Sequence, residues 1–152
     1  MSTPAITVAA LAPANAGPAA GLLERFFREE GFDTPFNRIA ASLDMMLADG
    51  TCWAALAMQS GEAVGVVTVT TMLFVEWGRL GEIGDLYVAP EWRGRGAGRA
   101  LIEAALTWCL VRGCSAVSVV ITPEGESRHG LSKFYRRHEF DPSGRTIMTR
   151  TL

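Results

Sequence analysis

The strongest constraint on the fold is a short glycine- and arginine-rich segment between two regular hydrophobic patterns. Residues 88–108 read VAPEWRGRGAGRALIEAALTW, and all three glycines of this stretch lie within residues 93–98. An apolar strand pattern at residues 80–88 precedes the segment, and residues 96–112 repeat apolar side chains at helical spacing. A continuous apolar run at residues 116–121 has the pattern of a fully buried strand. Together these patterns predict a βαβ unit.

The rest of the chain predicts an antiparallel meander with additional helices. We expect strands at 6–11, 51–59, 63–75 and 145–152, and helices at 13–30, 36–47 and 131–138. The polar segment at residues 122–130, TPEGESRHG, is interpreted as a connection. At 152 residues, the chain is predicted to form a single domain, residues 1–152. The expected class is α/β, with a mixed central sheet of about six to seven strands and about four helices.

Composition and charge argue against several classes of function. The formal net charge is −2, with 14 Lys and Arg against 16 Asp and Glu, so no nucleic-acid partner is expected. No run of about 18 apolar residues is present, so no membrane span is expected. The N-terminal stretch resembles a signal peptide but lacks a basic start, and Pro13 and Pro18 interrupt it. We therefore expect a cytoplasmic protein.

The cysteines and histidines predict no metal site. Cys52, Cys109 and Cys114, with two histidines, match no ligand spacing. An odd cysteine count without paired spacing predicts reduced thiols. Cys52 and Cys109 lie within apolar patterns and are interpreted as core residues.

The glycine–arginine segment has two interpretations. It is either a basic surface loop or an anion-binding loop. The N–H groups of a first helical turn have no intrahelical partner and carry partial positive charge, and glycines let an anion approach the backbone closely. A Walker A loop would need Gly-Lys-Ser/Thr after the glycines, and the dinucleotide fingerprint would need G-x-G-x-x-G; residues 94–99 supply neither.

Two motifs carry a resemblance to a known family. An R-x-x-G-x-G motif spans residues 93–98 after LYVAP at residues 86–90, and FYRRHEF stands at residues 134–140. This combination resembles the GCN5-related N-acetyltransferases (GNAT), and the expected order of elements is similar to that fold. The resemblance implies acetyl-CoA as cosubstrate, bound where strands four and five splay apart. The residues that it implies for acetyl-CoA binding are Leu86, Tyr87 and Val88 beside the pantetheine arm, and Arg93, Gly94, Arg95, Gly96, Ala97, Gly98 and Arg99 around the pyrophosphate.

The resemblance also implies direct acetyl transfer to a primary amine. Tyr135 matches the family's general acid, which protonates the departing thiolate; the alternative is an aromatic core residue. The backbone N–H near Val88 would polarise the thioester carbonyl. Two carboxylates are candidates for the general base. Glu82 matches the glutamate of histone-acetylating members, and Asp85 matches the aspartate of members that modify polyamines and aminoglycosides.

Strand alternation divides the roles of the two carboxylates. It places Glu82 and Asp85 on opposite faces of the sheet unless a bulge intervenes. Glu82 shares strand parity with Val88, so we expect Glu82 to be the base and Asp85 to anchor a cationic acceptor. The chain departs from the family pattern at Gly84, where several polyamine-type members have a glutamate, and at Glu139, where the usual residue is glycine.

The expected acceptor is a small polycationic amine such as an aminoglycoside or a polyamine. The long hairpin before residue 85 and the segment 122–130 resemble those of aminoglycoside 3-N-acetyltransferases, which act in antibiotic resistance. Glu124 and Glu126 are further candidate acids, with a solvated surface charge as the alternative. The competing functions are a protein N-terminal or lysine acetyltransferase and a non-catalytic acyl-CoA-binding sensor. Met72, Phe74 and Trp77 suggest either a homodimer contact or core packing.

Overall fold

A computed structural model describes residues 2–152 of the chain. Two units are distinguished within it, a larger one that ends at Val120 and a smaller one, Ile121–Leu152. No helix among the described residues is long and apolar enough to cross a membrane.

The larger unit is built on one mixed sheet of five strands in the order β1-β2-β3-β4-β5. Strands β1 to β4 are antiparallel neighbours, and β5 runs parallel to β4. Helix α3 connects the parallel pair, as the βαβ pattern predicts. The elements are β1 (Thr7–Ala10), the 3-10 turn η1 (Pro13–Asn15), α1 (Ala16–Glu29), α2 (Phe36–Ala48), β2 (Cys52–Gln59), β3 (Glu62–Phe74), β4 (Gly78–Val88), the 3-10 turn η2 (Pro90–Trp92), α3 (Ala97–Val111) and β5 (Ala116–Val119).

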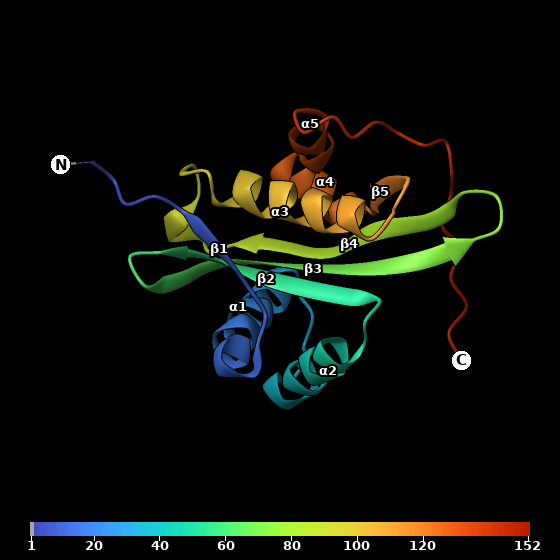
Figure 1. The fold of residues 1–152 in the computed structure, drawn as a ribbon. Coiled ribbons are helices and arrows are strands. Elements are labelled where there is room, and N and C mark those ends of the chain that lie inside the picture. The colour runs from blue at the N-terminus through green and yellow to red at the C-terminus, as the bar shows by residue number, and fades with distance from the viewer. Residues whose placement is uncertain (1) are drawn as a thin grey trace. The chain divides into compact units, whose positions relative to one another are not determined.

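Helices α1 and α2 cover one face of this sheet, and α3 covers the other (Figure 1). On the first face, Ile39 of α2 belongs to the same buried cluster as Leu56 of β2 and Val66 of β3. On the second face, Trp108 of α3 stacks on Trp53 of β2, with ring centroids 5.7 Å apart. Strands buried on both faces need apolar side chains at successive positions, which explains the nearly continuous apolar sequence of β2 and β3.

Two glycines allow α3 to pack closely against the sheet. A Cβ atom on Gly65 would lie 3.1 Å from Leu101 Cδ1, and one on Gly81 would lie 2.5 Å from Cys109 Sγ. Cys109 is 1% exposed, which confirms its interpretation as a core residue. These contacts fix α3, and with it the loop that precedes α3, against strands β3 and β4.

The smaller unit contains α4 (Pro123–His129) and α5 (Leu131–Arg136). Helix α4 forms in the polar segment for which the sequence predicts only a connection. Thr122 Oγ1 accepts the Gly125 N–H at 3.0 Å, and Pro123 occupies the first helical position. Both are start signals that the sequence already contains.

The strand predicted at residues 145–152 does not form, so the sheet has five strands instead of six to seven. Ile147 and Met148 are 63% and 92% exposed. Alternation permits a strand, but a stable strand also needs a neighbouring strand and a buried face. Among the described residues, no strand pairs with residues 145–152, and these residues are exposed. The strand at β5 is also shorter and less buried than predicted, with Ala116 and Ser118 exposed, because β5 is the edge strand of the sheet.

Candidate functional site

A bulge in β4 determines where the two candidate carboxylates point. Asp85 pairs with Thr68 of β3, whereas Ile83 pairs with the next residue, Val69, so Gly84 is an extra residue in β4. The bulge reverses the alternation of side chains beyond this point.

Glu82 and Asp85 therefore lie on the same face of the sheet. Glu82 pairs with Thr70 and Asp85 with Thr68, and these two threonines are two residues apart on one strand. The expectation that the carboxylates lie on opposite faces is wrong. The expectation that Glu82 and Val88 lie on the same face is wrong for the same reason. Val88 pairs with Gly65, on the face that α3 covers.

Asp85 is held by a short hydrogen bond from the neighbouring strand. The Thr68 hydroxyl donates to Asp85 Oδ2 at 2.6 Å, and Thr68 is 3% exposed. Burial raises the pKa of the Asp85 carboxyl, and the Thr68 hydrogen bond opposes this rise. A Cβ atom on Gly84 would lie 3.1 Å from Thr68 Oγ1, so glycine leaves room for this hydroxyl.

Beyond Ile83, the outer edge of β4 is not paired with β5. The β4–β5 ladder ends at the pair Ile83–Val119. The Ala89 N–H donates to Val64 O at 2.9 Å, toward β3. Because successive peptide groups of a strand point to opposite edges, the N–H and C=O of Val88 point away from β3. Arg93 Nε donates to Val88 O at 2.9 Å from that outer side.

The same alternation applies to the two preceding residues. The peptide groups of Leu86 point outward with those of Val88, and those of Tyr87 point toward β3. Thus the strand presents outward-pointing N–H groups at Leu86 and Val88, a few residues before the glycine–arginine segment of residues 93–98.

The loop that follows β4 ends at the start of α3, where backbone N–H groups are free. Gly94 and Gly96 have φ values of 75° and 93°, which favour glycine, and Gly96 is the N-cap of the helix. The Ala100 N–H donates to Gly96 O at 3.0 Å, as the first helical bond. The earlier N–H groups, of Ala97, Gly98 and Arg99, have no side-chain cap among the described residues. This geometry fits an anion such as a pyrophosphate.

The three arginines of the loop have different partners. Arg93 Nη2 lies 3.5 Å from Glu29 Oε2 of α1, and its guanidinium lies 5.7 Å from the centre of the Tyr87 ring. Arg95 lies over Trp92, and Arg99 Nε donates to Glu103 at 3.0 Å. Arg93 is thus directed toward β4 and α1.

Tyr87 takes part in this network through its side chain. Its hydroxyl donates to Glu29 Oε1 at 2.8 Å. Burial and this hydrogen bond raise the pKa of Tyr87. The Tyr87 ring also stacks on Phe26 of α1, with centroids 5.2 Å apart. The side chain of Tyr87 therefore connects the strand to α1.

In the smaller unit, Tyr135 is buried among aromatic rings. It is 6% exposed, and its ring meets those of Phe134 and Phe140 edge-on at 5.1 Å and 5.4 Å. Burial raises the pKa of Tyr135 to about 12, so the hydroxyl is protonated at neutral pH. Glu126 Oε2 accepts the Ser132 N–H at 2.7 Å, which gives this candidate acid a structural role at α5.

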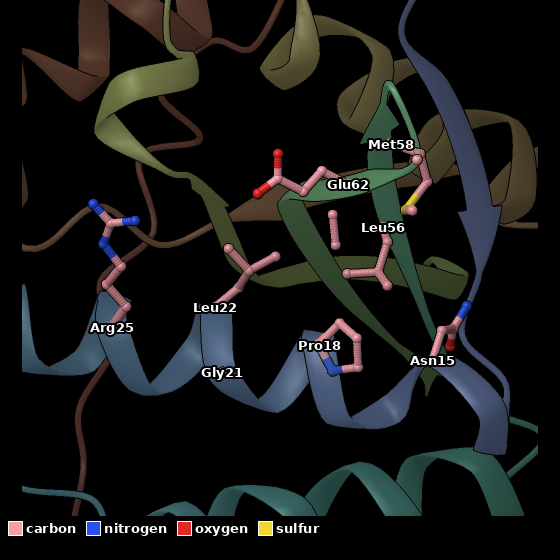
Figure 2. A pocket seen from close by; sticks show the side chains of 10 residues that line it. Asn15, Pro18, Gly21, Leu22, Arg25, Leu56, Met58 and Glu62 are labelled. Atoms are coloured by element: carbon pink, nitrogen blue, oxygen red, sulfur yellow. The ribbon is translucent and has the colours of Figure 1, made fainter.

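A separate groove of about 480 Å³ lies between α1 and the β2–β3 hairpin (Figure 2). Leu22 and Arg25 of α1 border it, with Leu56, Met58 and Glu62 from the hairpin. The residues lining this groove include none of the predicted site residues.

Three residues near the candidate site carry no signal in the sequence. Thr68, Glu29 and Arg25 contact partners that are distant along the chain, at Asp85, Tyr87 and Glu91. Only the strand register and the packing of α1 reveal these contacts.

Comparisons of sequence support the interpretation of the motifs. A sequence profile of the acetyltransferase (GNAT) family matches residues 19–140. An uncharacterized N-acetyltransferase of Archaeoglobus fulgidus is 37% identical over 91 residues, which cover 55% of this chain and 60% of that protein. Another, of Methanocaldococcus jannaschii, is 34% identical over 67 residues, which cover 44% of this chain and 28% of that protein. The chain thus spans only part of the length of these two relatives.

Solved structures share the fold at low sequence identity. The aminoglycoside N-acetyltransferase AAC(6')-Iy in complex with CoA has a TM-score of 0.86 and 19% identity, and the match covers 99% of this chain and 97% of that chain. A ribosomal-protein-alanine N-acetyltransferase of Brucella melitensis biovar Abortus 2308 has a TM-score of 0.78 and 22% identity, with 97% and 100% coverage. The family match extends over most of the sequence, and the chain therefore belongs to the acetyltransferase (GNAT) family.

Proposed function

We propose that this protein transfers an acetyl group from acetyl-CoA to a primary amine of a small polycationic acceptor, such as an aminoglycoside or a polyamine. One observation carries the proposal. The unpaired edge of β4 leads within a few residues into the uncapped N-terminus of α3. This arrangement can bind an extended amide-containing arm along the strand and a pyrophosphate at the helix.

In this proposal, the backbone of the larger unit binds the cosubstrate. The N–H groups of residues 94–99 hold the pyrophosphate, the outward N–H and C=O of Leu86 pair with the pantetheine arm, and the outward Val88 N–H faces the thioester at the end of that arm. Tyr87, whose peptide groups point toward β3, supports the strand through its side-chain bond to Glu29. Arg93, which is bonded to Val88 O, holds the loop against the end of β4.

The transfer requires a base, an oxyanion donor and an acid. Acetyl-CoA supplies the acetyl group as a thioester. The acceptor nitrogen forms a C–N bond to the carbonyl carbon while the C–S bond breaks. The outward Val88 N–H stabilises the oxyanion. The amine proton passes to a carboxylate, and the thiolate takes a proton from Tyr135.

We assign the base role to Asp85 and the binding of a cationic acceptor to Glu82. Asp85 lies three residues from Val88 and Glu82 lies six. Burial raises the pKa of Asp85, which increases its basicity as a carboxylate. Glu82 lies on the same face, where a second negative charge favours a polycation.

Tyr135 is proposed as the acid on the basis of the FYRRHEF motif. A phenol with a pKa of about 12 keeps its proton throughout the neutral range, so it is available as a donor.

The solved aminoglycoside acetyltransferases of this fold support the acceptor class. The exposed hairpin residue Phe74, at 43% exposure, is proposed as part of a homodimer contact, which sedimentation analysis would test.

The test of the proposed function is release of free thiol from acetyl-CoA with a panel of amines. The panel contains an aminoglycoside series, spermidine, and peptides with a free N-terminus or a lysine. We expect saturable turnover with the small polycations and formation of the acetylated amine by mass spectrometry. Turnover confined to the peptides would support a protein acetyltransferase. Binding of CoA without any turnover would support an acyl-CoA sensor instead.

A further inference from the structure

A buried hydroxyl interrupts the apolar sequence of β3. Residues 64–69 read VGVVTV, and Thr68 is 3% exposed. A buried hydroxyl is unfavourable unless it forms a hydrogen bond. Among the described residues, the Thr68 hydroxyl forms one side-chain hydrogen bond, which it donates to Asp85 Oδ2 at 2.6 Å. This distance is within the range of short bonds to carboxylates.

Two features of β4 make this bond geometrically feasible. The bulge at Gly84 turns Asp85 to the face on which Thr68 lies, because a regular strand would turn it to the opposite face. The missing side chain of Gly84 then leaves space for Thr68 Oγ1, 3.1 Å from where a Cβ atom would stand. A bulge, a glycine and a threonine from two strands therefore converge on one carboxylate oxygen.

We propose that Thr68 is the positioning residue for Asp85: its hydroxyl fixes Oδ2 and leaves Oδ1 to accept the proton of the acceptor amine. Within the described residues, Oδ1 has no hydrogen-bond partner. This inference rests on the proposed function, in which Asp85 is the base.

The bond also controls how readily Asp85 loses its proton. Burial raises the pKa of Asp85, and the Thr68 hydroxyl lowers it by donating to the ionised form. Loss of the hydroxyl leaves burial unopposed, so the carboxyl would stay protonated to a higher pH and the base would be lost there. Ionisable side chains on this face or on the helices packed against it are Cys52 of β2, Glu82 and Tyr87 of β4, Glu24, Arg25, Arg28 and Glu29 of α1, and Arg38 and Asp44 of α2.

The experiment compares Thr68→Val, which keeps the shape but deletes the hydroxyl, with Thr68→Ser, which keeps the hydroxyl. Thr70→Val is the matched control, since Thr70 lies two residues away on the same face and pairs with Glu82. Carboxyl ¹³C NMR titration of the free protein follows Asp85, with its signal assigned from Asp85→Asn. The pH profile of kcat/KM is measured on an amine that the wild type acetylates.

We expect Thr68→Val to move both the Asp85 titration and the acid limb of the profile to higher pH. Its kcat at pH 7 should fall about tenfold, the scale of one hydrogen bond to a charged group. Thr68→Ser should restore both, and Thr70→Val should leave the Asp85 titration unchanged. If Thr68→Val does not fold, Gly84→Ala tests the same bond, because its Cβ presses on the Thr68 hydroxyl.

An Asp85 titration that is the same in wild type and Thr68→Val would overturn the inference. An acid limb that stays in place while the Asp85 titration moves would overturn it too. Absence of turnover with every amine is a different result. It would overturn the proposed function, and with it the catalytic role of Asp85, whereas the NMR titration would still decide whether Thr68 controls this carboxyl.

Discussion

Arg25 of α1 and Glu91 of η2 form an ion pair with two hydrogen bonds. Arg25 Nη1 and Nη2 each donate to one Glu91 carboxylate oxygen at 2.7 Å. The two residues are 66 positions apart in the sequence, and Glu91 lies two residues before the glycine–arginine segment of residues 93–98. Arg25 Nε also lies 3.8 Å from Glu29, which contacts Arg93 of the loop. The start of the loop is therefore connected to α1 by two side chains, Glu91 within η2 and Arg93 directly after it.

This pair predicts a pH-dependent contribution to stability. The hydrogen bond from Arg25 lowers the pKa of Glu91 from 4.5 to about 2. A carboxyl with a lowered pKa stabilises the fold above its unfolded pKa, and this contribution is lost as the pH falls toward the folded value. The Tm of Glu91→Gln should be below that of the wild type at pH 7, and the difference should disappear between about pH 4.5 and 2.

Thermal unfolding monitored by circular dichroism measures this difference. Both side chains are substantially exposed, so added salt should also reduce it. Glu103→Gln is the control, because it removes an exposed ion pair within α3 alone. A Tm difference that stays constant from pH 7 to pH 2 would show that the ion pair is not its source.

The second prediction concerns the anion site at α3. Gly98→Val places a branched side chain beside the free N–H groups of the first helical turn, so the KM for acetyl-CoA should rise about tenfold or more. Gly98 is a better position than Gly96, whose φ of 93° would strain any side chain. Gly17→Val is the matched control, because Gly17 is likewise the second residue of a helix, with no atom within 4 Å of where a Cβ atom would stand.

Isothermal titration with CoA measures the effect on binding directly. Equal CoA affinity in folded Gly98→Val and Gly17→Val would contradict an anion site at this helix end. Circular dichroism of both variants separates a loss of binding from a loss of helix.

The third prediction concerns the proposed acid. Tyr135→Phe removes the hydroxyl and keeps the ring that packs against Phe134 and Phe140. We expect kcat to fall by about 10²-fold with little change in the KM for acetyl-CoA. Because the pKa of Tyr135 is about 12, the wild type should show no loss of activity from this group below pH 10. Phe134→Leu is the control for packing; an unchanged kcat in Tyr135→Phe would leave Tyr135 with a packing role alone.

Local patterns predicted most of the larger unit. The sequence predicts the glycine–arginine segment, the apolar stripe of α3 and the meander, because each depends on neighbours within a few residues. The loop motif likewise located the helix terminus and the strand before it. The bulge at Gly84 was not readable, because it exists only in the pairing of β4 with β3. The contact of Thr68 with Asp85 depends on that register and was missed for the same reason.

The C-terminal segment shows the opposite error. Its alternating residues predict a strand that the structure does not contain. Helix α4 forms from a polar segment, because its threonine cap and its proline favour a helix start despite the lack of an apolar stripe. Periodicity describes which face could be buried, whereas pairing and capping decide whether the element forms.

The fourth prediction follows from a strained backbone position in the smaller unit. Glu139 has a φ of 66°, a left-handed conformation that favours glycine. Glu139→Gly should stabilise the protein by about 1 kcal/mol, because glycine avoids the steric cost of a side chain there. Glu139→Ala is the control, since it removes the charge and keeps the strain. Chemical denaturation measures both variants, and equal stabilisation by alanine and glycine would attribute the effect to charge.

The last prediction separates Glu82 from Asp85. If Asp85 is the base, Asp85→Asn should lower kcat by about 10²-fold or more and remove the acid limb of the pH profile. Its activity should recover partly at high pH, where more of the acceptor amine is already neutral. If Glu82 binds the acceptor cation, Glu82→Gln should raise the acceptor KM about tenfold and leave kcat and the acid limb intact. Both profiles are measured on one polycationic acceptor and one monoamine. The KM effect of Glu82→Gln should be smaller on the monoamine, which has no second charge to bind. A lost acid limb in Glu82→Gln, with a normal limb in Asp85→Asn, would exchange the two roles.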